Sequence, residues 1–201
     1  CKGRHGGMTP TQYFDSLGYF RTPCVAAHAV WTEPCDWEIL QNRGVTVAAC
    51  PASNLKLGSG VAPIPRIMEA GLRVALGTDG VARNNNHDML RTAYLFSLVQ
   101  KGDTGDPTVV NPSTALRCAT INGAVAQGRF YCGLIREDFR AYLVVLDFDQ
   151  PHLQPATNVI NNIVYAASGN DVCLTMVDGN VLYRNGEWPT IDVERAQAET
   201  T

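Results

Sequence analysis

The chain has 201 residues, of which 45% are hydrophobic and 17% are charged, a composition typical of a folded globular protein. Its formal net charge of −3, with Lys and Arg scattered along the sequence, provides no basic surface for a nucleic-acid backbone. No apolar run approaches the roughly 20 residues that a transmembrane helix needs. We therefore expect a protein without a nucleic-acid partner and without a membrane span.

The cysteines and the first residues favour a reducing compartment. The seven cysteines form no C-x-x-C pair, and Cys24, Cys50 and Cys173 lie within apolar stretches. This is typical of free thiols in a reducing compartment. The first residues carry no apolar core of a secretory signal, so we expect a cytoplasmic protein. Cys1 stands in place of an initiator Met, which suggests that the sequence begins downstream of the true N-terminus.

The first part of the chain predicts alternating strands and helices. A short helix is expected over residues 9–17, with Thr9 as its N-cap and Pro10 at its first position. Apolar runs typical of strands buried on both faces lie at 24–27, 45–50 and 73–76. One helix is expected to begin after an N-cap at Thr32, and two more are expected over 61–70 and 87–101. Loops are expected at 51–60 and 77–86. This order predicts an α/β fold with a parallel sheet and right-handed crossovers.

The second part of the chain has a different character. A helix of small residues is expected over 112–126, with Gly128 as its stop. Beyond it, strands are predicted at 141–147, 162–166, 171–177 and 180–184. Asp178-Gly179 between the last two is a strong hairpin signal. We therefore divide the chain into residues 1–128 and a small β region over residues 129–201.

Reactive side chains follow the three strands of the first part. His28 and Asp79 are the first reactive side chains after the apolar runs at 24–27 and 73–76, and Cys50 ends the run at 45–50. In strand–helix barrels such positions meet at one rim. Gly77 and Gly80 allow a sharp turn around Asp79, whose carboxylate suits a metal ion or a proton from bound water. The alternatives are a packed or capping His28, a loop-capping Asp79 and a Cys50 that serves only packing.

Several linked motifs resemble the amidohydrolase superfamily. They are Ala27-His28-Ala29-Val30-Trp31, the run PASNLKLGSGVAPIP over residues 51–65, and Leu76-Gly77-Thr78-Asp79-Gly80. The closest branch is that of the 5-methylthioadenosine/S-adenosylhomocysteine deaminases and their chlorohydrolase relatives. The resemblance implies the C-terminal part of a (β/α)₈ TIM-type barrel, strands six to eight, followed by part of a small β-sandwich.

The same resemblance implies a metal-dependent hydrolytic deaminase that releases ammonia from an adenosine-like nucleoside. His28 and Asp79 would be catalytic, and Asp79 would also bind one divalent metal, zinc in the first place and iron or nickel as alternatives. Trp31, Asn54 and Asn84 would contact the substrate. A homo-oligomer is compatible with this assignment. Chlorohydrolase or guanine-type deaminase activity on the same scaffold is the alternative.

The resemblance also shows what this sequence lacks. The family's H-x-H pair on the first strand and the His and Glu near the fifth strand have no counterpart, so the chain alone would not complete the metal coordination. Ala49 stands where the family usually has His, and Arg83 stands where it usually has Ser. Tyr142 and Asp138 depart from the pattern at positions that bear on stability. A truncated, inactive half-barrel is therefore a further alternative.

Overall fold

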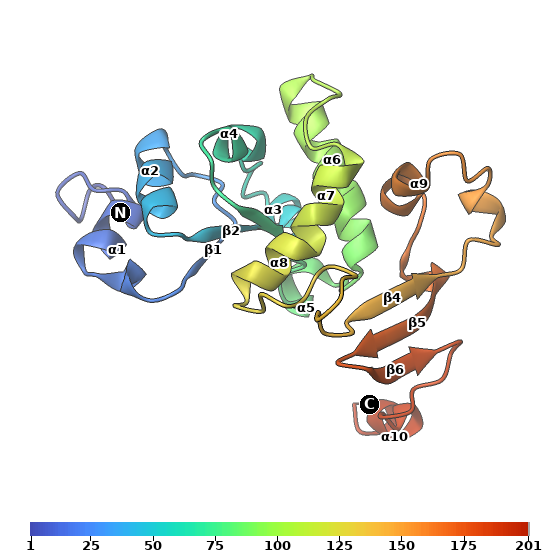
Figure 1. Cartoon of the computed structure of the whole chain (residues 1–201). Helices are drawn as coiled ribbons and strands as arrows, with labels where there is room; N and C mark the ends of the chain where they lie inside the picture. The colour runs from blue at the N-terminus through green and yellow to red at the C-terminus, as the bar shows by residue number, and fades with distance from the viewer. Residues whose placement is uncertain (201) are drawn as a thin grey trace.

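The computed structural model describes residues 1–200, and its first half contains a three-stranded parallel sheet (Figure 1). The strands are β1 (Val25–Ala27), β2 (Thr46–Ala49) and β3 (Val74–Leu76), in the spatial order β1-β2-β3. Ala26 pairs with Val47, and Ala48 pairs with Ala75. All three residues of β3 and three of the four in β2 are buried, as expected for apolar runs in a parallel sheet that is covered on both faces.

Helices connect the strands and cover the sheet. They are α1 (Pro10–Ser16), α2 (Pro34–Asn42), α3 (Pro51–Lys56), α4 (Ile64–Glu69), α5 (Val81–Asn84), α6 (Met89–Thr104), α7 (Pro112–Ala119) and α8 (Ile121–Ala126), with a 3₁₀ turn at Tyr19–Arg21. Thr9 caps α1 in a capping box with Gln12, as predicted. α7 and α8 pack on β3, while α6 packs on α3 and α7. Phe96, Ile64 and Ile67 are fully buried in the resulting core.

The second sheet is antiparallel and lies to one side of these helices (Figure 1). Its strands are β4 (Leu143–Leu146), β5 (Val172–Val177) and β6 (Asn180–Arg184), and the short helix α10 (Val193–Ala198) follows. The Asp178-Gly179 hairpin is confirmed, because Val177 pairs with Asn180 across it. Both turn residues have positive φ, 52° at Asp178 and 81° at Gly179, as type I′ hairpin turns require.

The strand predicted over residues 162–166 is wrong, because this segment belongs to helix α9 (Val159–Tyr165). Asn158 caps the helix by accepting from the Asn161 backbone NH. Val164 is fully buried, and the Tyr165 hydroxyl lies 3.1 Å from Ser97 Oγ on α6. Tertiary packing against α6 and α7 therefore overrides the strand preference of the branched and aromatic residues.

Other boundaries differ from the predictions at helix ends. α2 begins one residue later than expected, with Glu33 rather than Thr32 at its N-cap. The predicted loop 51–60 contains α3, and the predicted loop 77–86 contains α5. The predicted helix over 112–126 is broken at Thr120, whose φ of −118° and ψ of −90° are not helical. Within residues 1–200, no helix has both the length and the apolar character needed to cross a membrane.

Candidate active site

The two polar side chains that follow β1 and β3 are presented by unusual backbone conformations. His28 has a φ of 70° and Asp79 a φ of 61°, and a residue other than glycine adopts such values at an energetic cost. Backbone bonds to β2 hold both turns, with His28 N donating to Ala48 O and Gly77 N donating to Ala49 O, each at 2.9 Å. β2 therefore fixes the two turns at the same edge of the sheet.

His28 and Asp79 consequently face each other. His28 Nε2 lies 3.9 Å from Asp79 Oδ2, and both side chains are partly exposed. This separation is too long for a hydrogen bond, but a water molecule or another small polar group can lie within reach of both atoms. The sequence placed these residues at one rim, and the structure brings them together.

The carboxylate of Asp79 is held at both oxygens. Ser53 Oγ donates to Oδ2 at 2.6 Å, and the Gly80 backbone NH donates to Oδ1 at 2.7 Å. These two hydrogen bonds, that of Ser53 first, lower the pKa of Asp79 below its ordinary value, and the positive charge of Arg83 acts in the same direction. Asp79 is therefore ionised at neutral pH and can bind a cation or accept a proton.

The other predicted site residues take different positions. Asn54 is buried, and its Oδ1 lies 2.8 Å from His28 Nδ1, on the side of the ring away from Asp79. Trp31 is 84% exposed and lines the same open pocket as His28 and Asp79. Asn84 donates from Nδ2 to Thr78 O at 2.7 Å and lines a neighbouring pocket instead.

Ser53 and Arg83 also line the pocket of His28 and Asp79 and were not among the predicted site residues. Ser53 is buried in the first turn of α3 and donates to Asp79, and Arg83 belongs to α5. Ser53 adjoins Asn54 in sequence, but the segment reads as a loop, so the sequence carried no signal that a helix would direct its hydroxyl. Arg83 stands where the family pattern usually has Ser.

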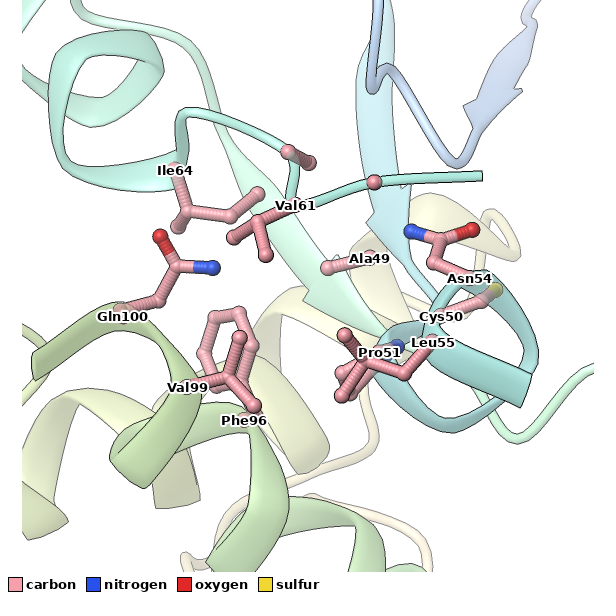
Figure 2. A pocket seen from close by; sticks show the side chains of 12 residues that line it. Ala49, Cys50, Pro51, Asn54, Leu55, Val61, Ile64, Phe96, Val99 and Gln100 are labelled. Atoms are coloured by element: carbon pink, nitrogen blue, oxygen red, sulfur yellow. The ribbon is translucent and has the colours of Figure 1, made fainter. Parts of the chain in front are cut away.

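Cys50 has no reactive character in the structure. Burial raises the pKa of its thiol to about 11, and the negative charge of Asp79 adds to this effect. Figure 2 shows Cys50 with Ala49 and Asn54 around a small cavity between α3 and α6. The cavity of about 10 Å³ has largely apolar walls and is near the lower limit for one water molecule. Cys50 therefore serves packing, and the polar chemistry lies on the outer side of α3.

Similar proteins were identified by sequence and by structure. A family model described as the amidohydrolase family matches residues 1–182. The chain is 48% identical over 181 residues to the 5-methylthioadenosine/S-adenosylhomocysteine deaminase of Thermococcus onnurineus (strain NA1), and the match covers 90% of this chain and 42% of that protein.

Two solved structures share the fold. An adenosine deaminase from Xanthomonas campestris with bound zinc has a TM-score of 0.93 at 31% identity, covering 98% of this chain and 45% of that one. The second is a mutant of atrazine chlorohydrolase from Arthrobacter aurescens TC1, complexed with zinc and atraton. It has a TM-score of 0.91 at 26% identity, and the match covers 99% of this chain and 44% of that one. The chain thus spans less than half the length of these relatives. With nine-tenths of its length matched by the family model, this chain belongs to the amidohydrolase family.

Proposed function

We propose that this chain forms part of a metal-dependent hydrolytic deaminase that releases ammonia from an adenosine-like nucleoside of the methylthioadenosine or S-adenosylhomocysteine class. The observation that carries the proposal is the His28–Asp79 pair, 3.9 Å apart at the ends of two parallel strands, in a chain 48% identical to a deaminase of that class. Because this chain matches less than half of its relatives' length, the proposal concerns the longer protein that contains it.

The arrangement of the strands supports a position in a barrel. We infer that β1, β2 and β3 correspond to strands six, seven and eight of a (β/α)₈ barrel, and that residues 129–201 belong mainly to a small β-sandwich beside it. In such barrels, functional side chains collect at the C-terminal strand ends, where His28 and Asp79 lie. α9 packs on α6 and α7, so the two parts would share an interface.

The described residues fit one part of a metal site. The ionised carboxylate of Asp79 is a suitable ligand. Within residues 1–200, no group of three or more His, Cys, Asp and Glu side chains could hold a metal ion, whereas a catalytic zinc takes about three protein ligands. Asp79 would therefore contribute one ligand, with the others from the rest of the longer protein. When bound, a divalent metal, zinc in the first place, supplies Lewis-acid activation of water.

The chain's own residues would handle the protons and the substrate. Water adds to the ring carbon that bears the amino group, and Asp79 takes a proton from that water. The proton passes to the departing amino nitrogen and ammonia leaves, while the remaining hydroxyl hydrogen moves to the adjacent ring nitrogen as the carbonyl forms. His28 Nε2 would orient the attacking oxygen from the opposite side, and Trp31 offers an exposed aromatic face to the planar base.

The test uses the longer protein that contains this chain. Ammonia release is measured with methylthioadenosine, S-adenosylhomocysteine, adenosine and guanine, and metal content is measured in the same preparation. We expect turnover on the adenosine-like thioethers and stoichiometric divalent metal. Turnover on guanine alone would contradict the nucleoside assignment. Absence of both metal and turnover would favour the inactive half-barrel.

A chlorohydrolase is the second candidate, and its support is the similarity to the atrazine chlorohydrolase structure with zinc and atraton. The same pair of side chains could serve attack by water on a ring carbon that carries chloride. Chloride release from atrazine, measured beside ammonia release from the nucleosides, separates the two activities. Chloride release without nucleoside turnover would establish the second candidate.

A further inference from the structure

Two consecutive residues of α3 each reach one member of the His28–Asp79 pair. Ser53 is 1% exposed and donates to Asp79 Oδ2, while Asn54 is 4% exposed and contacts His28 Nδ1 at 2.8 Å. α3 begins directly after the middle strand, so its first turn lies between the ends of the two outer strands. Figure 2 shows Asn54 on this turn, beside Cys50.

We propose that Asn54 is a positioning residue that fixes the tautomer of His28. In this arrangement His28 Nδ1–H donates to Asn54 Oδ1, and Nε2 keeps a free lone pair that points toward Asp79 and the reacting centre. The inference rests on the proposed function for its catalytic meaning, whereas the tautomer itself is a property of this chain.

The geometry around the imidazole favours this tautomer. With the Asn54 amide oriented so that Oδ1 faces the ring, an Nδ1 without a proton would place its lone pair 2.8 Å from that oxygen, and two acceptors would oppose each other. On the other side of the ring, Nε2 is 3.9 Å from Asp79 Oδ2, too far for that carboxylate to hold a proton on Nε2. The charged groups that line the pocket with His28 are Asp79 and Arg83, and neither faces Nδ1 within hydrogen-bond distance.

The position of Asn54 is itself well defined. Its backbone NH donates to Cys50 O at 3.0 Å, and its carbonyl accepts from Ser59 N at 2.8 Å. The His28 backbone is held in turn by the bond from its NH to Ala48 O. The His28 end of the Nδ1–Oδ1 contact is therefore held by β2, and the Asn54 end belongs to α3, the helix that follows β2. Such an arrangement sets the direction of the imidazole before any substrate arrives.

The catalytic consequence concerns the attacking water. An Nε2 with a free lone pair accepts a hydrogen bond from that water and directs its oxygen toward the ring carbon. The other tautomer presents Nε2–H and would donate to the water oxygen instead, which opposes attack. Loss of the Asn54 acceptor should therefore reduce kcat more than it changes KM, by roughly 100-fold in kcat, the lower end for a positioned acid–base group.

The experiment measures the tautomer directly. The longer protein is labelled with ¹⁵N-histidine, and the Nδ1 and Nε2 resonances of His28 are assigned by their loss in His28→Gln. In the wild-type protein we expect a protonated Nδ1 and an unprotonated Nε2. A protonated Nε2 in the wild-type protein overturns the inference without any need for a variant.

Variants at Asn54 separate tautomer control from simple packing. Asn54→Leu removes the acceptor at similar volume and should give a mixed tautomer with reduced kcat, whereas Asn54→Asp keeps an acceptor and should retain the wild-type tautomer. Asn122→Ala is the structural control, because it removes a 2.7 Å bond from Nδ2 to Val74 O and should lower the melting temperature without changing the His28 tautomer.

The outcomes distinguish this inference from the proposed function. A wild-type tautomer in Asn54→Leu would contradict the positioning role, even if the protein is an active deaminase. If the protein turns over no nucleoside, the deaminase proposal fails, and the resonances still decide the tautomer. If Asn54→Leu does not fold, the wild-type protein and Asn54→Asp carry the test, and an unprotonated Nδ1 in Asn54→Asp overturns the inference.

Discussion

The two sheets of this chain differ in burial and in chemistry. All of β3 and most of β2 are buried, although Val25 in the outer strand β1 is 48% exposed. In the second sheet every residue of β5 is partly exposed, and Val144 in β4 is 60% exposed. Both sheets have turn residues with positive φ, namely His28 and Asp79 after strands of the first sheet and Asp178 in the hairpin of the second. The difference lies in what holds the turns. Those at His28 and Asp79 are hydrogen-bonded through the backbone to the mostly buried strand β2, whereas the Asp178-Gly179 turn is exposed, so reactive side chains lie where a buried strand holds the backbone.

Asp79→Asn should give the largest effect. Loss of the ionised carboxylate removes both a proton acceptor and a metal ligand, and we expect kcat/KM to fall by about 10³-fold. Ammonia release and metal content of the longer protein are the measurements. The matched control is Asp178→Asn in the hairpin of the second sheet, where Asn also tolerates positive φ. An equal fall in kcat/KM in both variants would contradict the assignment of the catalytic residues to the first region alone.

A pair of valine truncations tests the difference in burial. Val47→Ala in β2 removes a fully buried side chain and should lower the free energy of unfolding by about 2 kcal/mol. Val144→Ala in β4 should change it by no more than about 0.5 kcal/mol, because that side chain is mostly exposed. Urea unfolding of both variants provides the measurement. A similar decrease in the free energy of unfolding for both variants would mean that the second sheet is buried in the longer protein.

Arg83→Ser tests whether the first region also selects the substrate. Arg83 lines the same pocket as Asp79 and Trp31, and its positive charge lowers the pKa of Asp79. We expect the variant to lose about tenfold in kcat/KM for S-adenosylhomocysteine, which carries a carboxylate, relative to methylthioadenosine, because a carboxylate–arginine bond is charge-assisted. Arg140→Ser, which breaks a pair with Asp178, should leave that ratio unchanged. An unchanged ratio in Arg83→Ser would place anion recognition elsewhere.

Asp171→Asn should give the smallest effect, in the second region. Burial opposes ionisation of Asp171, but bonds from Ser168 and His152 outweigh it and lower its pKa below the ordinary 3.8. A lowered folded-state pKa stabilises the protein above pH 3.8, and this stabilisation is lost as pH falls through the folded-state value. Asp171→Asn should therefore lower the free energy of unfolding by about 1 kcal/mol at pH 7, and by less at acidic pH. Urea unfolding at pH 7 and near pH 3.5 checks this, and a cost independent of pH would contradict it.

The local sequence determined several elements by itself. Thr9 and Pro10 predict the start of α1, Asp178-Gly179 predicts the hairpin, and the apolar runs predict the three parallel strands. These features depend on backbone preferences and hydrophobic patterning within a few residues, so no distant contact is needed to read them. The same local patterning predicts His28 and Asp79 at strand ends, since they are the first reactive side chains after two of these runs.

Only the tertiary structure decided the rest. Residues 162–166 join a helix because Val164 and Tyr165 pack against distant residues, which a short apolar run does not reveal. The partners Ser53 and Asn54 are 26 residues from the side chains they contact, and their direction depends on a helix in a segment that reads as a loop. The sequence thus determined which side chains stand at the strand ends. Their 3.9 Å separation and their hydrogen-bonded partners came from parallel pairing, which aligns the ends of strands that are far apart in sequence.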